Sequence, residues 1–268
     1  MAVVRAKKIA TGVATLDVES GGGMPEGALV TLLGSPGSGH YEFAYTSAIM
    51  TAVSKATSGE SDKADMVKPS EVCYISFGRT KEDIVSELYY GHSADLCSIF
   101  EEQVTFKDMS EMFFSHPKIA IDEGKAGGPD VLKETIKILE ERPKNSLIIL
   151  HSLSDLAKIF QGENVEKYTL YLMELRKAIR KSKSLAYGLL DKGALTEHMQ
   201  NNVIDVSDGV LSYGWREAGS SERKRVMYID KFRGLMTHMA EGVPIFDVGV
   251  SPQTGFAISK VTKITRVG

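Results

Sequence analysis

The sequence predicts an α/β fold in which a mostly parallel sheet is flanked by helices. Two observations carry this prediction. Up to about residue 200, apolar runs typical of buried strands alternate with segments of helical spacing, the pattern of a parallel sheet covered on both faces. Beyond residue 200, strand-like pieces follow one another with turns and no long helix between them. These last pieces indicate antiparallel hairpins added at the edge of the sheet.

The separate elements are predicted from apolar spacing and from turn and capping signals. We expect buried strands at residues 28–33, 71–77, 146–150 and 185–190, and helices at residues 41–56, 80–90, 132–142 and 168–179. After residue 200 we expect strands at 203–206, 209–213, 225–232, 244–249 and 255–260, with a charged hairpin loop at 216–225. Thr80 is expected to cap the second helix together with Asp83, a weaker partner than Glu or Gln.

Length and composition favour one large domain. The chain has 268 residues, of which 43% are hydrophobic, so we expect a single domain over 1–268. We divide it into an N-terminal lead-in (1–27), a parallel α/β core (28–200) and a C-terminal β extension (201–268). The net charge of −3 gives no electrostatic case for nucleic acid, so DNA binding is not expected. No apolar stretch approaches a membrane span, and we expect a cytoplasmic protein.

The stretch GSPGSGHY, residues 34–41, has the frame of a phosphate-binding loop, G-x-x-x-x-G-K-[ST]. It follows a predicted buried strand and opens a predicted helix, the setting in which backbone N–H groups hold an anion. The ending departs from the pattern, because His40 stands in place of lysine and Tyr41 in place of serine or threonine. The candidate ligand-binding residues of this degenerate loop are Gly34, Ser35, Gly37, Ser38, Gly39, His40 and Tyr41.

Neither altered residue can perform the standard task. In a phosphate loop the lysine reaches the β- and γ-phosphates, and the following hydroxyl binds Mg²⁺. His40 is shorter than lysine, and an ordinary histidine is mostly neutral at pH 7. Tyr41 carries its hydroxyl about 4 Å farther from the backbone than serine does, by simple bond lengths. Its ring would also crowd a metal ion.

The opening stretch TGVATLDVESGGGMPEGALVTLLGSPGSG, residues 11–39, resembles the start of KaiC-like and RadA-like ATPases of the RecA superfamily. The residues that fit are Thr11, Gly12, Leu16, Asp17, Gly21, Gly22, Gly23, Pro25 and Gly27. The order of the later segments is similar too, so the resemblance covers nearly the whole chain. It implies a RecA-like P-loop fold.

The resemblance also indicates where the catalytic groups of such an ATPase would stand, and these positions are altered. In KaiC-like proteins the second strand ends in Phe-Glu-Glu, whereas here Phe77 is followed by Gly78 and Arg79. The Walker B strand normally ends in an Asp that orients Mg²⁺, and here His151 takes that position. Asp155 lies four residues past the strand end and is not expected to replace it. We therefore assign no catalytic residue and expect a pseudo-ATPase.

The segment YIDKFRG, residues 228–234, resembles the Lys-x-Arg-Gly strand of KaiC-like proteins. There the two cations reach the γ-phosphate of a neighbouring subunit, which makes Lys231 and Arg233 candidate interface residues. The alternative is that they are alternate charges on the solvated face of a hairpin strand. Residues two apart on a strand share a face, so the spacing is compatible with both interpretations.

We therefore expect a non-catalytic KaiC-like protein that acts as a regulatory or scaffolding subunit, by self-association or with a related active ATPase subunit. A second hypothesis is weak binding of ATP, ADP or another anion without hydrolysis, since the loop backbone is intact. An ATPase with unconventional residues and a DNA-recombination accessory resembling RadA paralogues are further alternatives. No cofactor and no metal site is expected. A metal site shared by His40 and His151 is an alternative hypothesis, because the phosphate loop and the Walker B strand are neighbours in this fold.

Overall fold

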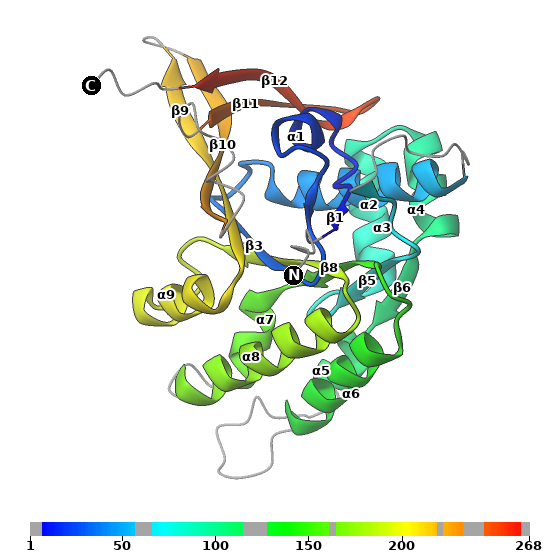
Figure 1. The fold of residues 1–268 in the computed structure, drawn as a ribbon, viewed down its shortest axis with the longest axis vertical. Coiled ribbons are helices and arrows are strands. Elements are labelled where there is room, and N and C mark those ends of the chain that lie inside the picture. The colour runs from blue at the N-terminus through cyan, green and yellow to red at the C-terminus, as the bar shows by residue number, and fades with distance from the viewer. Residues whose placement is uncertain are drawn as a thin grey trace, which may run out of the picture.

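A computed structural model of the chain describes residues 7–56, 66–114, 128–160, 165–218, 222–232 and 244–263. The helices are α1 (Ala14–Glu19), α2 (His40–Ala56), α3 (Lys81–Gly91), α4 (Ala94–Gln103), α5 (Ser110–Phe114), α6 (Gly128–Glu141), α7 (Leu153–Ile159), α8 (Val165–Lys181) and α9 (Glu197–Val206). The strands are β1 (Lys8–Ile9), β2 (Met24–Pro25), β3 (Leu29–Gly34), β4 (Met66–Val67), β5 (Val72–Ser76), β6 (Thr105–Asp108), β7 (Leu147–His151), β8 (Leu185–Asp191), β9 (Gly209–Ala218), β10 (Glu222–Phe232), β11 (Pro244–Ser251) and β12 (Gly255–Lys263). Figure 1 shows their arrangement.

Within these residues, a nine-stranded sheet runs in the order β12-β11-β10-β9-β3-β8-β7-β5-β6. The strands from β9 to β6 pair in parallel, with β3 between β8 and β9. Strands β10, β11 and β12 pair antiparallel. Strands β1, β2 and β4 form a separate small sheet. The predicted α/β fold class, with a mostly parallel sheet and antiparallel C-terminal strands, is confirmed.

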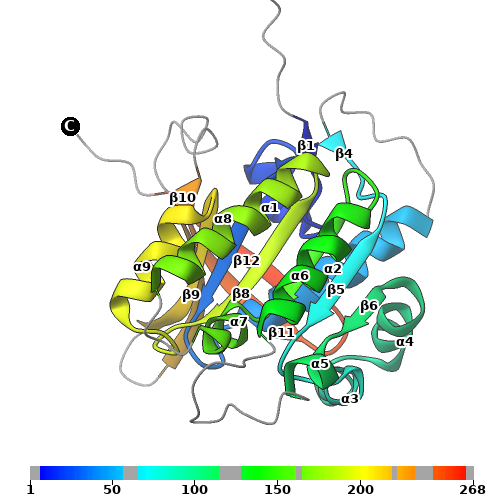
Figure 2. The same cartoon turned by 90° about the horizontal axis from the view of Figure 1, so that it is seen from below.

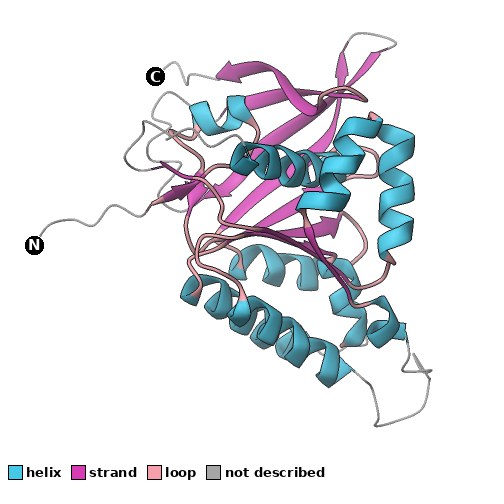
Figure 3. Cartoon of the chain, turned by 90° about the vertical axis from the view of Figure 1, so that its right-hand side faces the viewer, coloured by secondary structure: helices cyan, strands magenta, loops and turns pink. Residues whose placement is uncertain are grey.

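Helices cover both faces of the large sheet, as Figure 3 shows. On β3, Val30 and Leu32 belong to the apolar cluster that holds α2, α3 and α4. Leu29 and Leu33, pointing the other way, belong to the cluster that holds α6, α8 and α9. Figure 2 shows α6 and α8 lying across this second face. Every β3 residue is therefore buried, which explains why the strand appears in the sequence as an unbroken apolar run.

The last strand, β12, lies against α2. The backbone N–H of Phe256 donates to Oγ1 of Thr46 at 2.7 Å. The Phe256 ring lies edge-on to Phe43, with ring centroids 5.2 Å apart. The antiparallel strands thus cover the first turns of α2, close to the glycine loop. None of the described helices is long and apolar enough to cross a bilayer.

The strand predicted at residues 203–206 is wrong, because these residues form the end of α9. Met199, Val203 and Val206 recur at helical spacing and are buried against the sheet. Oγ1 of Thr196 accepts a hydrogen bond from the Met199 N–H at the start of the helix. The short run Val-Ile-Asp-Val is compatible with both the two-residue period of a strand and the 3.6-residue period of a helix. The helix forms because its apolar face is buried against the sheet.

The β9–β10 hairpin is longer than predicted, since most of the expected loop at 216–225 pairs as strand. The pairing runs outward to Ala218 and Glu222. Arg223 and Arg225 both lie over the Trp215 ring, at 5.0 and 4.8 Å from its centroid. Such cross-strand cation–π contacts stabilise the extended ladder. In addition, β9 pairs in parallel with β3, so antiparallel pairing begins one strand later than the sequence predicts.

The predicted cap of α3 is confirmed. Oγ1 of Thr80 accepts from the Asp83 N–H at 3.1 Å, and the Asp83 carboxylate accepts from the Thr80 N–H at 3.1 Å. Aspartate therefore completes a capping box here. The neighbouring elements α4, β6 and α5 fall in a stretch of the sequence for which no element is predicted.

Candidate functional site

The glycine loop connects β3 to α2 at the carboxyl edge of the parallel strands, as the sequence predicts. Gly37 and Gly39 adopt φ values of 67° and 108°, which L side chains rarely adopt. The N–H and hydroxyl of Ser38 both donate to the carbonyl of Ser35, at 3.0 and 2.7 Å. Because α2 begins at His40, its first-turn N–H groups have no partners within the helix.

His40 and Tyr41 bind the same carboxylate, that of Asp191 at the end of β8. Nε2 of His40 lies 3.1 Å from Oδ1, and the Tyr41 hydroxyl donates to Oδ2 at 2.9 Å. Burial alone would raise the pKa of Asp191, but the hydrogen bonds from His40 and Tyr41 hold it below its ordinary value. Burial, and then the Asp191 charge, raise the pKa of Tyr41. The tyrosine is therefore a donor to an ionised carboxylate.

The His40 ring lies over the start of the loop. A Cβ placed on Gly34 would be 2.0 Å from Nδ1 of His40 and 2.2 Å from its Cγ. The side chain is 1% exposed, and Nδ1 has no hydrogen-bond partner in the described part of the chain. Gly34 is thus required by the close approach of this ring.

His151, at the end of β7, is bonded to Tyr74 on β5. Nδ1 of His151 and the Tyr74 hydroxyl are 2.6 Å apart. Burial, with a smaller effect of Arg79, lowers the pKa of His151 to about 4. Burial also raises the pKa of Tyr74 well above its ordinary value. A neutral imidazole therefore accepts through Nδ1 from the Tyr74 hydroxyl, and its own proton resides on Nε2.

The Tyr41 ring contacts both histidines, with centroids 4.3 Å from His40 and 5.1 Å from His151. Each histidine already has one ring nitrogen bonded, to Asp191 or to Tyr74. Over the residues that the structure describes, no group of three or more His, Cys, Asp or Glu side chains could hold a metal ion. The two histidines thus both lie against the Tyr41 ring in one cluster.

The position of Gly78, after β5, is filled from a different element. A Cβ on Gly78 would lie 2.8 Å from Cγ of Asp155. The Asp155 carboxylate accepts from the Ser152 hydroxyl at 2.9 Å and from Lys158 at 2.7 Å. The carboxylate of α7 thus occupies the space that a side chain at position 78 would need. Its hydrogen bonds to Ser152 and Lys158 hold it in that position.

Arg79 forms an ion pair with Glu87 of α3 and also contacts the Asp83 carbonyl. Its guanidinium therefore binds to α3, the helix that follows it. Lys231, on β10, donates to the carbonyls of Ile204 and Asp205 at 2.7 and 2.8 Å, at the C-terminal end of α9. Arg233, its predicted companion, lies outside the described residues, so the interface role of the pair stays a prediction.

The β9–β10 hairpin contacts the outer side of the loop. Nε1 of Trp215 donates to the carbonyl of Pro36 at 3.1 Å, and Nε of Arg225 donates to the carbonyl of Gly37 at 2.9 Å. Cδ of Arg225 is 3.7 Å from where a Cβ on Gly39 would lie. A guanidinium therefore lies beside a loop that lacks its lysine. This contact could not be predicted from the sequence, because it depends on how the β9–β10 hairpin lies against the loop.

Asp191 is a further residue of the site that was not predicted from the sequence. The predicted strand ends at residue 190, one position short of it. A signal was present, since an acidic residue directly following a buried strand lies at the edge where parallel strands present functional groups. What the sequence does not show is that β8 is the immediate neighbour of β3, which places Asp191 beside the loop.

These residues do not fit a magnesium nucleotide bound in the usual way. Such a site needs a cation on the phosphates, a hydroxyl on Mg²⁺ and an acidic side chain at the Walker B position. His40 and Tyr41 are both engaged with Asp191, and the Walker B position holds a neutral His151. The geometry engages the two loop residues with a carboxylate of the chain itself.

Comparisons with known proteins agree with the fold. The family model described as "ATPase: KaiC" matches residues 9–250. A solved KaiC-like protein from the hyperthermophilic archaeon Pyrococcus horikoshii is similar, with a TM-score of 0.66 and 16% identity over 95% of this chain and 100% of that one. The flagellar accessory protein FlaH from Methanocaldococcus jannaschii has a TM-score of 0.61 and 18% identity over 92% and 95%. At these identities, the two structures support the fold alone. No curated protein sequence matches significantly.

Proposed function

This chain belongs to the KaiC family of ATPases, and we propose that within this family it is a non-hydrolysing member that acts as a regulatory or scaffolding subunit. The observation that carries the proposal is the pair of contacts from His40 and Tyr41 to one carboxylate, Asp191. Both residues that would serve phosphate and magnesium are held by a group of the chain itself.

The electrostatics argue against phosphoryl transfer. Catalysis of this reaction consists almost wholly of positioning and of stabilising negative charge on the transferred group. Here the pKa of Asp191 is lowered by its partners, so an ionised carboxylate lies next to the loop at neutral pH. A γ-phosphate would meet like charge there. The Tyr41 hydroxyl would also have to leave its bond to Asp191 before it could bind a metal ion.

The regulatory role would be exercised through association, either between copies of this chain or with a related active ATPase subunit. The support is the resemblance of 228–234 to a strand that faces a neighbouring subunit. Lys231, within that segment, donates hydrogen bonds to the end of α9, which ties β10 to that helix. Size-exclusion chromatography with light scattering tests the idea. A strict monomer, alone and mixed with a KaiC-family ATPase from the same cell, would contradict it.

The absence of hydrolysis is tested with purified protein and Mg-ATP, by following phosphate release. The expected result is no turnover above that of a buffer control. Turnover that disappears in His40→Ala would overturn the proposal, because it would assign the activity to this loop and not to a contaminating ATPase.

A second candidate is binding of an anion or nucleotide without hydrolysis. It is favoured by the loop backbone, with Gly37 and Gly39 in left-handed conformations, and by the Arg225 guanidinium bonded to the Gly37 carbonyl. Thermal unfolding with ATP, ADP and cyclic dinucleotides discriminates between the two, because a ligand that binds only the folded state raises the Tm. A shift that Arg225→Gln abolishes would favour binding. No shift at millimolar nucleotide leaves the scaffolding role.

A further inference from the structure

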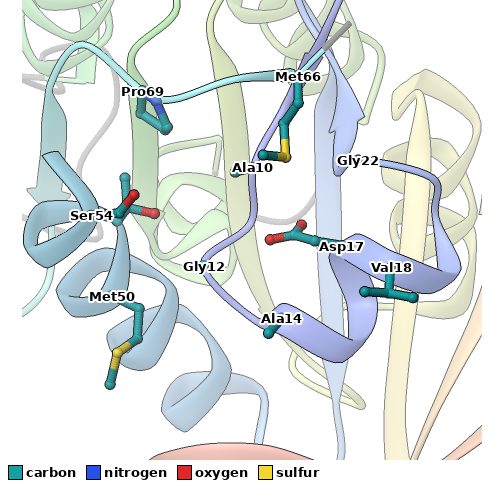
Figure 4. A pocket seen from close by; sticks show the side chains of 11 residues that line it. Ala10, Gly12, Ala14, Asp17, Val18, Gly22, Met50, Ser54, Met66 and Pro69 are labelled. Atoms are coloured by element: carbon teal, nitrogen blue, oxygen red, sulfur yellow. The ribbon is translucent and has the colours of Figure 1, made fainter. Parts of the chain in front are cut away.

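A pocket of about 480 Å³ opens between α1, α2 and β4, and Figure 4 shows it from close by. The residues of α2 that line it come from the C-terminal half of the helix. The glycine loop lies at the other end, before the first turn of α2. Much of its lining is apolar, with Val18 from α1, Met50 from α2 and Met66 from β4. Its volume falls in the range of small-molecule sites. Methionine side chains adapt readily to the shape of a ligand.

Asp17 contributes a carboxylate to this lining. One of its oxygens accepts from the Thr11 N–H at 2.8 Å. Burial raises the pKa of Asp17, and the hydrogen bonds from Thr11 and Gly12 offset only part of that effect. Among the described residues, no Lys or Arg side chain is a cause of this shift in the pKa of Asp17. A carboxylate in such surroundings gains from a cation brought by a ligand, because burying a charge without a partner is costly.

The opposite wall, on α2, carries a hydroxyl group from Ser54. Thr51, about one helical turn earlier, also lines the pocket, but its Oγ1 is fully buried and offers no surface to a ligand. Figure 4 shows Asp17 and Ser54 projecting from α1 and α2 toward the space between them. A hydroxyl oxygen accepts hydrogen bonds from an ammonium group, so Ser54 suits the same ligand as the carboxylate.

We propose that this pocket binds a small organic amine. Its ammonium group pairs with the Asp17 carboxylate and donates to the hydroxyl of Ser54. Its apolar body lies against Met50 and Met66. An anion is disfavoured by the carboxylate, and a neutral apolar ligand would leave that carboxylate further desolvated without a partner. The proposal is independent of what the glycine loop binds.

The first test uses the wild-type chain labelled with ¹³C at the methionine methyl groups. It is titrated at neutral pH with benzylamine, which is then an ammonium ion, and with benzyl alcohol, a neutral ligand of similar size. Saturable shifts are expected for Met50 and Met66, with at least tenfold tighter binding of the amine. The buried Met199 and Met227 serve as internal controls and should not respond. Equal affinity for the two ligands, or no response of Met50 and Met66, overturns the proposal.

The second test uses Asp17→Asn, whose amide oxygen can still accept from the Thr11 N–H. Glu19→Gln is the matched control, because Glu19 lies on the same helix outside the lining residues and pairs with Lys263 at 3.3 Å. The first variant is expected to bind benzylamine at least tenfold more weakly, and the control should bind as the wild type does. Undiminished binding in Asp17→Asn contradicts the proposal. Should that variant fail to fold, the amine–alcohol comparison on the wild type still decides.

Discussion

The Tyr41 hydroxyl donates a 2.9 Å hydrogen bond to Asp191 and thereby ties the first turn of α2 to the end of β8. The two residues are 150 positions apart in the sequence, yet β3, which leads into the loop and α2, is the neighbour of β8. His40 reaches the same carboxylate. The end of the glycine loop is consequently held by internal contacts that contribute to the stability of the fold.

Tyr41→Phe tests this contribution. Removing the hydroxyl takes away a hydrogen bond to a charged group, which is expected to lower the free energy of unfolding by about 1–3 kcal/mol. Urea unfolding provides the measurement. Tyr90→Phe is the control, since Tyr90 is 91% exposed, and its effect should stay within about 0.5 kcal/mol. Equal effects of the two substitutions would show that the contact with Asp191 is not stabilising.

His151 predicts a pH dependence of stability. Its pKa is about 4 in the folded chain and about 6.5 when unfolded, so the unfolded state binds more protons between these values. Stability therefore falls as the pH decreases from 6.5 to 4, by on the order of 3 kcal/mol for this group. Urea unfolding of the wild type and of His151→Asn at pH 7, 6 and 5 checks this. The variant should lose less stability over that interval, and parallel profiles would refute the assignment.

Gly34→Ala is expected to be strongly destabilising, because the added methyl group would stand 2.0 Å from Nδ1 of His40. Overpacking at such a position typically costs about 1–3 kcal/mol. The control is Gly91→Ala, where a Cβ meets nothing within 4 Å. Combining Gly34→Ala with His40→Ala should recover part of the loss, since the smaller side chain vacates the contact. Additive losses in the double variant would mean that the histidine ring is not the obstacle.

The double variant His40→Lys with Tyr41→Thr tests what the loop itself lacks. It is expected to gain Mg-ATP binding, seen as a rise in Tm, because it restores the phosphate-binding cation and the metal-binding hydroxyl. It should not gain hydrolysis, since Gly78 and His151 remain. His198→Lys, on the surface of α9, controls for the added charge. Measurable turnover in the double variant would show that the other two positions are dispensable.

The sequence predicted the fold better than the site, for a physical reason. Buried parallel strands appear as unbroken apolar runs, so β3, β5, β7 and β8 were located within one or two residues. The strand predicted at 203–206 was wrong because the four-residue segment Val-Ile-Asp-Val fits both the period of a strand and that of a helix. Only the buried spacing of Met199, Val203 and Val206 distinguishes them.

The altered positions of the site were visible in the sequence, but their partners were not. A sequence shows that His40 replaces a lysine, whereas the contact with Asp191 depends on strand order. The same holds for Tyr74, whose bond to His151 joins residues 77 positions apart. Arg225 pairs with Trp215, which lies beyond the predicted end of the preceding strand at 213, so its contact with the loop was not visible in the sequence.

The placement of Asp155 against Gly78 bears on how this chain could change over evolution. A glutamate introduced at position 78 would clash with the Asp155 carboxylate, because its Cβ alone would lie 2.8 Å from Cγ of Asp155. Ser152 and Lys158 hold Asp155 where it is. A change from Gly78 to glutamate therefore passes through a disfavoured intermediate unless position 155 changes first. The order of the two substitutions decides whether this site can accept an acidic side chain after β5.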